Sequence, residues 1–406
     1  MSPSSAIDYV TKAKRRFYTT TALTSAYFAT GNWLFFWRLY LTNGGIGVVD
    51  AICYLVGTLA EVPTGAIADR IGRRRIMLLG VILLGIGYTV MGLAINGNMI
   101  LIGYMIYSIG SSFYSGADDA LMYDYLKTNN EAGQWETIAR RKQLVMRVVS
   151  VLATFIGGYM YVVNMRMPSL VRGGFFLLAI IPILSMAFMD SAQPKTTRDS
   201  TVTYFQHLWT GVRDLLNRKM LPVVLLVMGV QGVTVSIFIG GLLRPLMLER
   251  TGLPVPDHAT LIALASLITV AILLRPRPKN KKVSSVFRQA ILYTGIIILG
   301  FVLNLPAGWL AGGVVGVFLI HVGDYLLVPA TSALINASVS STHRATALST
   351  ANLIEHLPYI IAAPLIGLAA DQGQLTLVIQ IVLVVICSAT LLAILTHNRL
   401  KNNLPA

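Results

Sequence analysis

The chain has 406 residues, of which 55% are hydrophobic and 12% are charged, and its formal net charge is +15. Soluble domains carry about 25% charged residues, so the composition excludes an ordinary soluble protein and indicates a polytopic membrane protein. Lys and Arg fall mostly in alternate short loops, which argues against a nucleic-acid-binding protein. The two isolated cysteines, Cys53 and Cys387, give neither a disulfide framework nor a metal-ligand spacing.

Apolar runs long enough to cross a bilayer as helices, which takes roughly 20 residues, recur along the chain. We predict twelve spans, at residues 18–41, 46–66, 76–94, 99–122, 144–163, 169–188, 220–243, 258–274, 288–305, 308–331, 345–370 and 375–395. Basic residues precede the first span and follow every second one, with Arg166, Arg172 and Arg250 as exceptions. By the positive-inside rule, both termini are expected to be cytoplasmic.

The longest polar interval divides the spans into two groups of six. We therefore predict a cytoplasmic N-terminal segment, a six-helix bundle, a cytoplasmic linker, a second six-helix bundle and a cytoplasmic tail, at residues 1–17, 18–188, 189–219, 220–395 and 396–406. Apolar residues at helical spacing within 201–218 predict an amphipathic helix that lies on the membrane surface.

The segment from Gly65 to Arg75 joins spans two and three. Five of its eleven residues are charged, so the segment must lie in water. It resembles the signature loop between helices 2 and 3 of the major facilitator superfamily, whose fixed positions are matched by Gly65, Asp69, Arg70, Gly72, Arg73 and Arg74. The alternative is a generic basic loop, which requires neither the Asp nor the two glycines.

The resemblance implies an all-α fold of twelve transmembrane helices in two six-helix bundles, with both termini cytoplasmic. Such proteins alternate between two access states by rocking one bundle against the other. In the superfamily the matching Asp lies near helix 11, and the matching Arg pairs with acidic groups at the end of helix 4. Carried to this chain, Asp69 and Arg73 form a latch between the bundles, with Asp118, Asp119 or Asp124 as partners for Arg73. The alternative is that these charges only anchor loops.

Ionisable residues within spans are costly and mark functional positions. His321 and Asp324 are three residues apart on span ten, share one helix face and are the first candidates for proton coupling. Glu355 and His356, midway along span eleven, are the second candidates. Glu61, one turn before the signature segment, is a further candidate. Structural pairing is the alternative for each of them.

Residues that face the substrate are expected on spans one, four, seven and ten, because these helices line the central cavity in the superfamily. Aromatic rings with scattered hydroxyl groups suit an amphiphilic ligand, although helix packing also explains the small hydroxylated residues. The two arginines in this set, Arg38 and Arg244, either attract an anionic substrate or extend to the outer interface. The candidates are Asn32, Trp33, Phe36, Arg38, Tyr104, Tyr107, Ser108, Ser111, Gln231, Arg244 and Tyr325.

The leading hypothesis is a secondary active transporter that exports a small amphiphilic or drug-like molecule in exchange for protons. Short segments at 115–124 and 344–349 are similar to a bacterial, efflux-like branch, but span four lacks the Arg, and span five the Gly-Pro pair, of typical drug–proton antiporters. The alternatives are uptake or facilitated transport of a small polar or anionic metabolite, and a non-transporting membrane sensor or scaffold.

No phosphate-binding loop of the Walker type is present, so we expect an ion gradient, most simply of protons, to supply the energy. We expect no enzymatic activity, no cofactor and no metal. The expected partners are a small-molecule substrate, protons and the lipid bilayer, with no nucleic acid, and the chain is expected to act as a monomer in the cell (inner or plasma) membrane.

Overall fold

The computed structural model describes residues 3–189, 220–273, 283–338 and 344–402. The side chains of some residues in these ranges, among them Gly65, Asp69, Arg70 and residues 344–354, lie outside the described part, as does the amphipathic helix predicted at 201–218. Every regular element in the described ranges is helical. The chain divides into two compact units, one formed by residues 1–40 and 52–201 and the other by residues 41–51 and 202–406.

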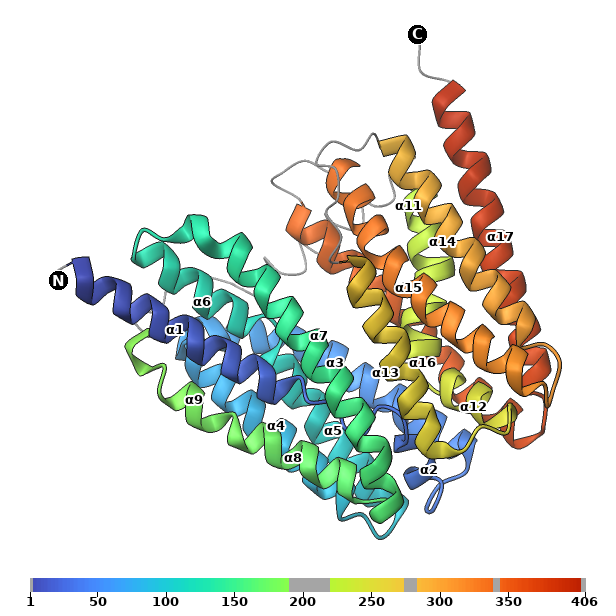
Figure 1. Cartoon of the computed structure of the whole chain (residues 1–406), viewed down its shortest axis with the longest axis horizontal. Coiled ribbons are helices and arrows are strands. Elements are labelled where there is room, and N and C mark those ends of the chain that lie inside the picture. Colours follow the sequence, from blue (N-terminus) through green and yellow to red (C-terminus); the bar gives the residue numbers. More distant parts are fainter. Residues whose placement is uncertain (1–2, 190–219, 274–282, 339–343, 403–406) are drawn as a thin grey trace. The chain divides into compact units, whose positions relative to one another are not determined.

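The first unit consists mainly of long helices that pack on one another. In Figure 1, α4 lies beside α5 and α8 in this unit. Its core includes Phe17, Met77 and Met122, which are fully buried between different helices. The elements from the start of the chain to the end of this unit are α1 (Pro3–Thr24), α2 (Trp33–Trp37), α3 (Asn43–Ile71), α4 (Arg73–Gly92), α5 (Gly97–Tyr114), α6 (Ala117–Thr128), η1 (Ala132–Gln134), α7 (Trp135–Val163), α8 (Met167–Leu178), α9 (Ile180–Leu184) and η2 (Ala187–Met189).

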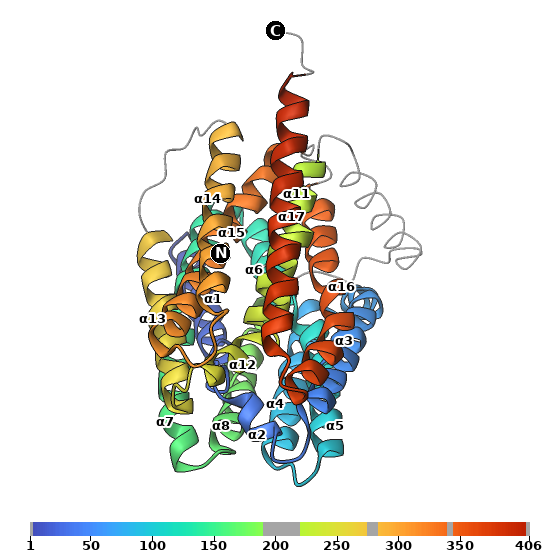
Figure 2. The same cartoon turned by 90° about the vertical axis from the view of Figure 1, so that its right-hand side faces the viewer.

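The second unit begins with a helix of unusual geometry. Residues Val227–Ile239 form a π-helix, η3, that continues directly from α11 (Leu221–Leu226). In Figure 2, α14 lies close to α15 and α17 in this unit. The remaining helices are α12 (Leu243–Arg250), α13 (Val255–Leu273), α14 (Val283–Leu303), α15 (Leu310–Ser338), α16 (Arg344–Asp371) and α17 (Leu375–Asn402).

The helices agree with the predicted transmembrane architecture. Within the described residues, nine helices are long and apolar enough to cross a membrane. Of the other three predicted spans, 99–122 is largely helical as α5 and α6, and 345–370 lies within α16, whereas 18–41 holds only the end of α1 and the short helix α2. The side of the membrane on which the termini lie remains a prediction.

The first predicted span is not one continuous helix, as the sequence suggested. Helix α1 ends at Thr24, and the chain resumes helical structure only at Trp33. Neighbouring groups stabilise the unwound stretch between them: the Asn32 amide donates to the Gly157 carbonyl over 3.0 Å, and the Thr154 hydroxyl donates to the Tyr27 carbonyl over 3.3 Å. Irregular backbone at membrane depth requires such partners, because lipid offers none.

Glycine on α7 allows this close approach. A Cβ at Gly157 would overlap the backbone of Phe28, so no larger residue fits at this position without moving the unwound stretch. Gly157 on the fifth predicted span therefore has a packing role in this structure.

The first part of α3 belongs with α16 rather than with the rest of the first unit. A Cβ at Gly47 would overlap the carbonyl of Ala363, and a Cβ at Gly367 would overlap the carbonyl of Asn43. Residues 41–51 therefore cluster with the second unit, although the sequence places them in the first bundle.

Candidate functional site

A buried polar network occupies the second unit and contains two of the predicted carboxylates. Asp324 on α15 and Glu355 on α16 are 3% and 4% exposed. Gln231 on η3 donates to Glu355 over 2.9 Å and accepts from Thr331 over 2.6 Å. Thr234, three residues after Gln231, donates to Asp324. Both carboxylates thus accept hydrogen bonds from one helix in an apolar interior.

The π-helical geometry of η3 explains how one helix serves several partners on α16. Gln231 and Ser236 are five residues apart, which is the separation of hydrogen-bonded residues in a π-helix, so both side chains can reach α16. Gln231 bonds the Glu355 side chain, while the Ser236 hydroxyl donates to the Glu355 carbonyl and lies 2.8 Å from Nδ1 of His356. Long π-helical runs are rare and often mark functional positions.

The predicted pairing of His321 with Asp324 does not occur as a direct hydrogen bond. His321 Nε2 lies 2.9 Å from the Ser266 hydroxyl on α13, and its Nδ1 has no hydrogen-bond partner within the described residues. The ring of Tyr325, another predicted residue, lies 4.7 Å from the imidazole. Arg244 is buried in the same unit. Although His321 and Asp324 share one helix face, their hydrogen-bond partners come from two different helices, α13 and η3.

Aromatic side chains form a continuous array in the first unit. The ring centroids of Trp33 and Trp37 are 4.9 Å apart, and those of Trp37 and Tyr104 are 5.2 Å apart. Tyr104 then lies 5.7 Å from Tyr107, which lies 5.0 Å from Tyr88 on α4. The predicted residues Trp33, Tyr104 and Tyr107 are therefore neighbours in one array that extends from α2 through α5.

The other predicted substrate residues of the first unit lie in different environments. Asn32 is buried and bonds the Gly157 carbonyl, and Phe36 is buried against Tyr40. Arg38 is partly exposed and lies with its guanidinium 5.7 Å from the ring centroid of Phe35. Of the two predicted serines on α5, Ser108 is buried and Ser111 is exposed.

The signature segment spans the end of α3 and the start of α4. Arg73 Nε and Asp124 Oδ2 form an ion pair at 2.8 Å, and Gly72, before the first residue of α4, has a φ of +92°. Arg74 is partly buried and Glu61 is exposed, while the predicted roles of Gly65, Asp69 and Arg70 concern side chains outside the described part.

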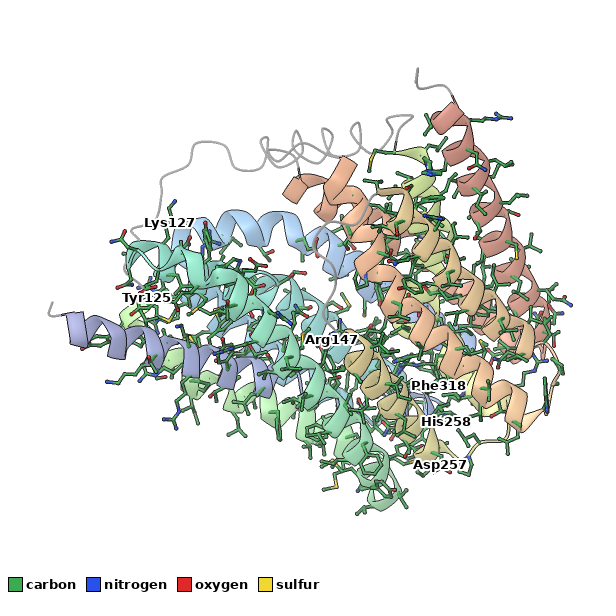
Figure 3. All side chains as sticks on the ribbon, turned by 45° about the horizontal axis from the view of Figure 1, so that its top comes forward. Tyr125, Lys127, Arg147, Asp257, His258 and Phe318 are labelled. Atoms are coloured by element: carbon green, nitrogen blue, oxygen red, sulfur yellow. The ribbon has the colours of Figure 1, made fainter. Side chains whose placement is uncertain are left out.

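The other two predicted acids near the signature segment have a different partner. Lys142 on α7 lies 2.7 Å from both Asp118 and Asp119, which form the first turn of α6. Figure 3 shows that Lys127, at the far end of α6, points away from the helices. Asp124 is thus the acid that pairs with Arg73, and Asp118 and Asp119 join α6 to α7.

The sequence analysis missed three buried or bridging groups. Asp50 on α3 is buried and accepts a hydrogen bond from the hydroxyl of Tyr359 on α16. Arg172, which the sequence analysis took for an exception among the outer loops, is buried within α8. Asp371, assigned to a bare loop, bonds the first residues of α3. A carboxylate within an apolar run was a usable signal for Asp50, whereas the partners of the other two are set by tertiary packing.

Comparison with known proteins agrees with the geometry. The chain is similar to a crystal structure of a mutant of the nucleoside transporter NupG, with a TM-score of 0.72 and 11% identity over 96% of this chain and 99% of that one. It is also similar to an auto-inhibited peptide transporter of the POT family, with a TM-score of 0.71 and 10% identity over 98% and 99% of the two chains.

A third similar structure is the bacterial homologue of the human lysosomal transporter Spinster, in an inward-facing and unoccupied conformation. Its TM-score is 0.66, with 15% identity over the whole of both chains. At these identities the likeness establishes the fold alone. Among curated proteins, no sequence matches this chain.

A family model provides the assignment that the distant structures cannot. The model of the Major Facilitator Superfamily matches residues 17–363, which include the signature segment, the aromatic array and both buried carboxylates. The family is one of membrane transporters of small molecules, which agrees with the multi-pass architecture and does not suggest an enzyme. This chain belongs to the Major Facilitator Superfamily.

Proposed function

We propose that this protein is a proton-coupled transporter. The observation that carries the proposal is the network of Asp324 and Glu355, two buried carboxylates hydrogen-bonded to one helix through Thr234 and Gln231. Two charged carboxylates in one apolar interior are unfavourable, so at least one of them favours a bound proton. Release of that proton would change the hydrogen bonds that join α15, α16 and η3.

The aromatic array supports a small substrate with a planar or amphiphilic part. Stacked and edge-to-face rings such as Trp33, Tyr104 and Tyr107 favour contact with another ring, and their polar atoms can orient it. Two of the similar structures are nucleoside and peptide transporters, which handle solutes of this size. Export in exchange for protons is the leading hypothesis for the direction, and proton-linked uptake is the alternative.

Proteoliposomes that contain a pH-sensitive dye test this proposal. We would impose a proton gradient and add uridine, a dipeptide, benzoate and ethidium in turn. A compound that provokes proton flux is then followed in radiolabelled form, and the sign of its coupling to the gradient gives the direction of transport. If none of the four compounds provokes proton flux, the result contradicts proton coupling to a substrate of this class.

Variants of the network identify the coupling group. We expect Asp324→Asn or Glu355→Gln to reduce gradient-driven accumulation at least tenfold while exchange of labelled for unlabelled substrate continues, because exchange needs no net proton movement. Asp257→Asn is the matched control, since Asp257 lies in the first turn of α13 in the same unit and outside the network. Accumulation that survives both network substitutions would assign the network a structural role.

A further inference from the structure

Arg172 is a buried arginine in the first unit that none of the roles described so far explains. It is 2% exposed on α8, and its Nη1 donates to the carbonyl of Ala26 over 2.8 Å. Its Nε has no hydrogen-bond partner within the described residues. The guanidinium therefore contacts the unwound stretch between α1 and α2 directly.

Aromatic rings provide most of the remaining environment of this guanidinium. Its Cζ lies 4.0 Å from the ring centroid of Tyr27, 4.8 Å from that of Tyr88 and 4.9 Å from that of Phe176. Ring faces stabilise a cation through their quadrupole, but they carry no net charge. No ion pair of the described residues includes Arg172. Within the described part of this unit, ring faces, the hydroxyl groups of Tyr88 and Tyr107 and one carbonyl solvate the positive charge, and no carboxylate neutralises it.

An uncompensated buried cation is costly, so its presence in the core requires an explanation beyond packing. A leucine or methionine would fill the space beside Tyr88 and Phe176 without this cost, but it would not donate to the Ala26 carbonyl. The hydrogen bond to Ala26 also keeps the charge itself close to the unwound stretch.

Tyr27 connects Arg172 to the accessible part of that stretch. Tyr27 keeps 37% of its surface exposed, although Arg172 lies over its ring. Tyr88, which also faces Arg172, is part of the aromatic array through Tyr107. A molecule that stacks on these rings would lie one ring away from a full positive charge. In a partly dry interior, a charge at such a distance changes the affinity for another charge by a factor on the order of ten.

We propose that Arg172 is a specificity-determining residue that makes the first unit reject cations, so that the substrate is a neutral or anionic planar molecule. The proposal rests on the proposed function, since it assumes that the aromatic array contacts the substrate. The proposal narrows the expected substrate class, a small amphiphilic or drug-like molecule, by excluding amphiphilic cations. The same guanidinium holds the Ala26 carbonyl and so fixes the ring of Tyr27 between the charge and the substrate.

Three probes of nearly equal size test the charge preference: 2-naphthoate, 2-naphthamide and 2-naphthamidine. Their affinities for the full-length protein in lipid nanodiscs would be measured by isothermal titration calorimetry at neutral pH. We expect the wild-type protein to bind the amidine at least tenfold more weakly than the amide, and the carboxylate no more weakly than the amide. Equal or tighter binding of the amidine by the wild type would overturn the proposal without the use of any variant.

Substitutions then assign the preference to one residue. We expect Arg172→Lys to keep the preference for the amide over the amidine, because it keeps the charge beside the rings. We expect Arg172→Met to bring the affinities for the amide and the amidine within about threefold of each other. Arg166→Met is the matched control, because Arg166 lies in the same unit but bonds the hydroxyl of Tyr40 over 2.8 Å, and we expect it to leave the preference intact. A tenfold preference that persists in Arg172→Met would overturn the assignment to Arg172.

Two further outcomes separate this proposal from the proposed function. If Arg172→Met does not fold, Arg172→Gln takes its place, with the same expected loss of preference. If no probe binds the wild-type protein, the assumed contact between array and substrate is wrong and the inference fails, while proton coupling through Asp324 and Glu355 is decided separately by the flux assay.

Discussion

At the scale of single residues, Asp371 was assigned to a loop from the sequence, but in the structure its carboxylate bonds the start of α3. Its Oδ1 accepts from the backbone amide of Asn43 over 3.0 Å, and its Oδ2 accepts from that of Gly44 over 2.8 Å. These amides begin α3, where the helix dipole also favours a negative charge. Partial burial alone would raise the pKa of Asp371, but the hydrogen bonds from Gly44 and Asn43 outweigh it and lower that pKa below the ordinary value for aspartate.

This shift predicts a pH-dependent contribution to stability. Because the folded-state pKa of Asp371 is lowered, its contribution is complete above the unfolded-state pKa of roughly 3.9 and is lost as the pH falls through the lower folded-state pKa. We therefore expect Asp371→Asn to lower the melting temperature at pH 7, and the difference from wild type to shrink as the pH falls below 4. Thermal unfolding of both proteins in detergent between pH 7 and pH 3 checks this. A difference that is constant with pH would show that the carboxylate charge is not what stabilises the contact.

Residue types within spans were predictable from the sequence, but their partners were not. Gln231, Asp324 and Glu355 stand out as polar groups in apolar runs, and all three join one network. Their pairing depends on the helical register of η3, which has no signature in the sequence. His321, chosen with Asp324 because three residues separate them, bonds Ser266 on another helix instead.

At the scale of elements, the unwound stretch of the first span depends on a contact with α7. The carbonyl and Cα of Phe28 occupy the place where a side chain at position 157 would begin. Backbone cannot yield as a flexible side chain does, so this contact limits residue 157 to glycine.

A single methyl group tests the importance of this contact. We expect Gly157→Ala to destabilise the protein by about 2 to 3 kcal/mol or to displace the unwound stretch, because overpacking of a core costs that much. Gly174→Ala on α8 is the matched control, since a Cβ at Gly174 meets nothing within 4 Å. Thermal unfolding of both variants in the same detergent provides the measurement, and equal melting temperatures would contradict the contact between α7 and the unwound stretch.

Hydropathy explains why the spans were predictable and their breaks were not. Length and apolar character place each of the twelve segments, because the bilayer requires both. The stretch 25–32 contains no proline, and its residues typical of a turn, Ser25, Gly31 and Asn32, are too few to predict a break in the helix. Its unwinding is due to partners far along the chain, Thr154, Gly157 and Arg172, which a local pattern cannot reveal.

At the scale of the whole molecule, α3 is divided between the two units. Residues 41–51 belong to the second unit and the remainder of α3 to the first, yet the helix is continuous from Asn43 to Ile71. No proline interrupts it between Asp50 and Glu61. Members of this superfamily work by the rocking of one bundle against the other. A helix that belongs to both bundles must therefore release one of its two sets of contacts, or bend, during each cycle.

We expect the contacts of residues 43–51 with α16 to separate, because the longer part of α3 belongs to the first unit. A disulfide between Asn43→Cys and Asp371→Cys, in a protein whose native Cys53 and Cys387 are replaced by alanine, would tie them together, since the two native side chains lie within 2.8 Å. We expect oxidation to reduce transport at least tenfold and a reductant to restore it. Each single-cysteine variant, treated with the same oxidant, is the control for other effects of oxidation and of losing Asp371. Full transport by the oxidised double variant would mean that residues 43–51 move with the second unit, and α3 would then have to bend near Ala51 in every cycle.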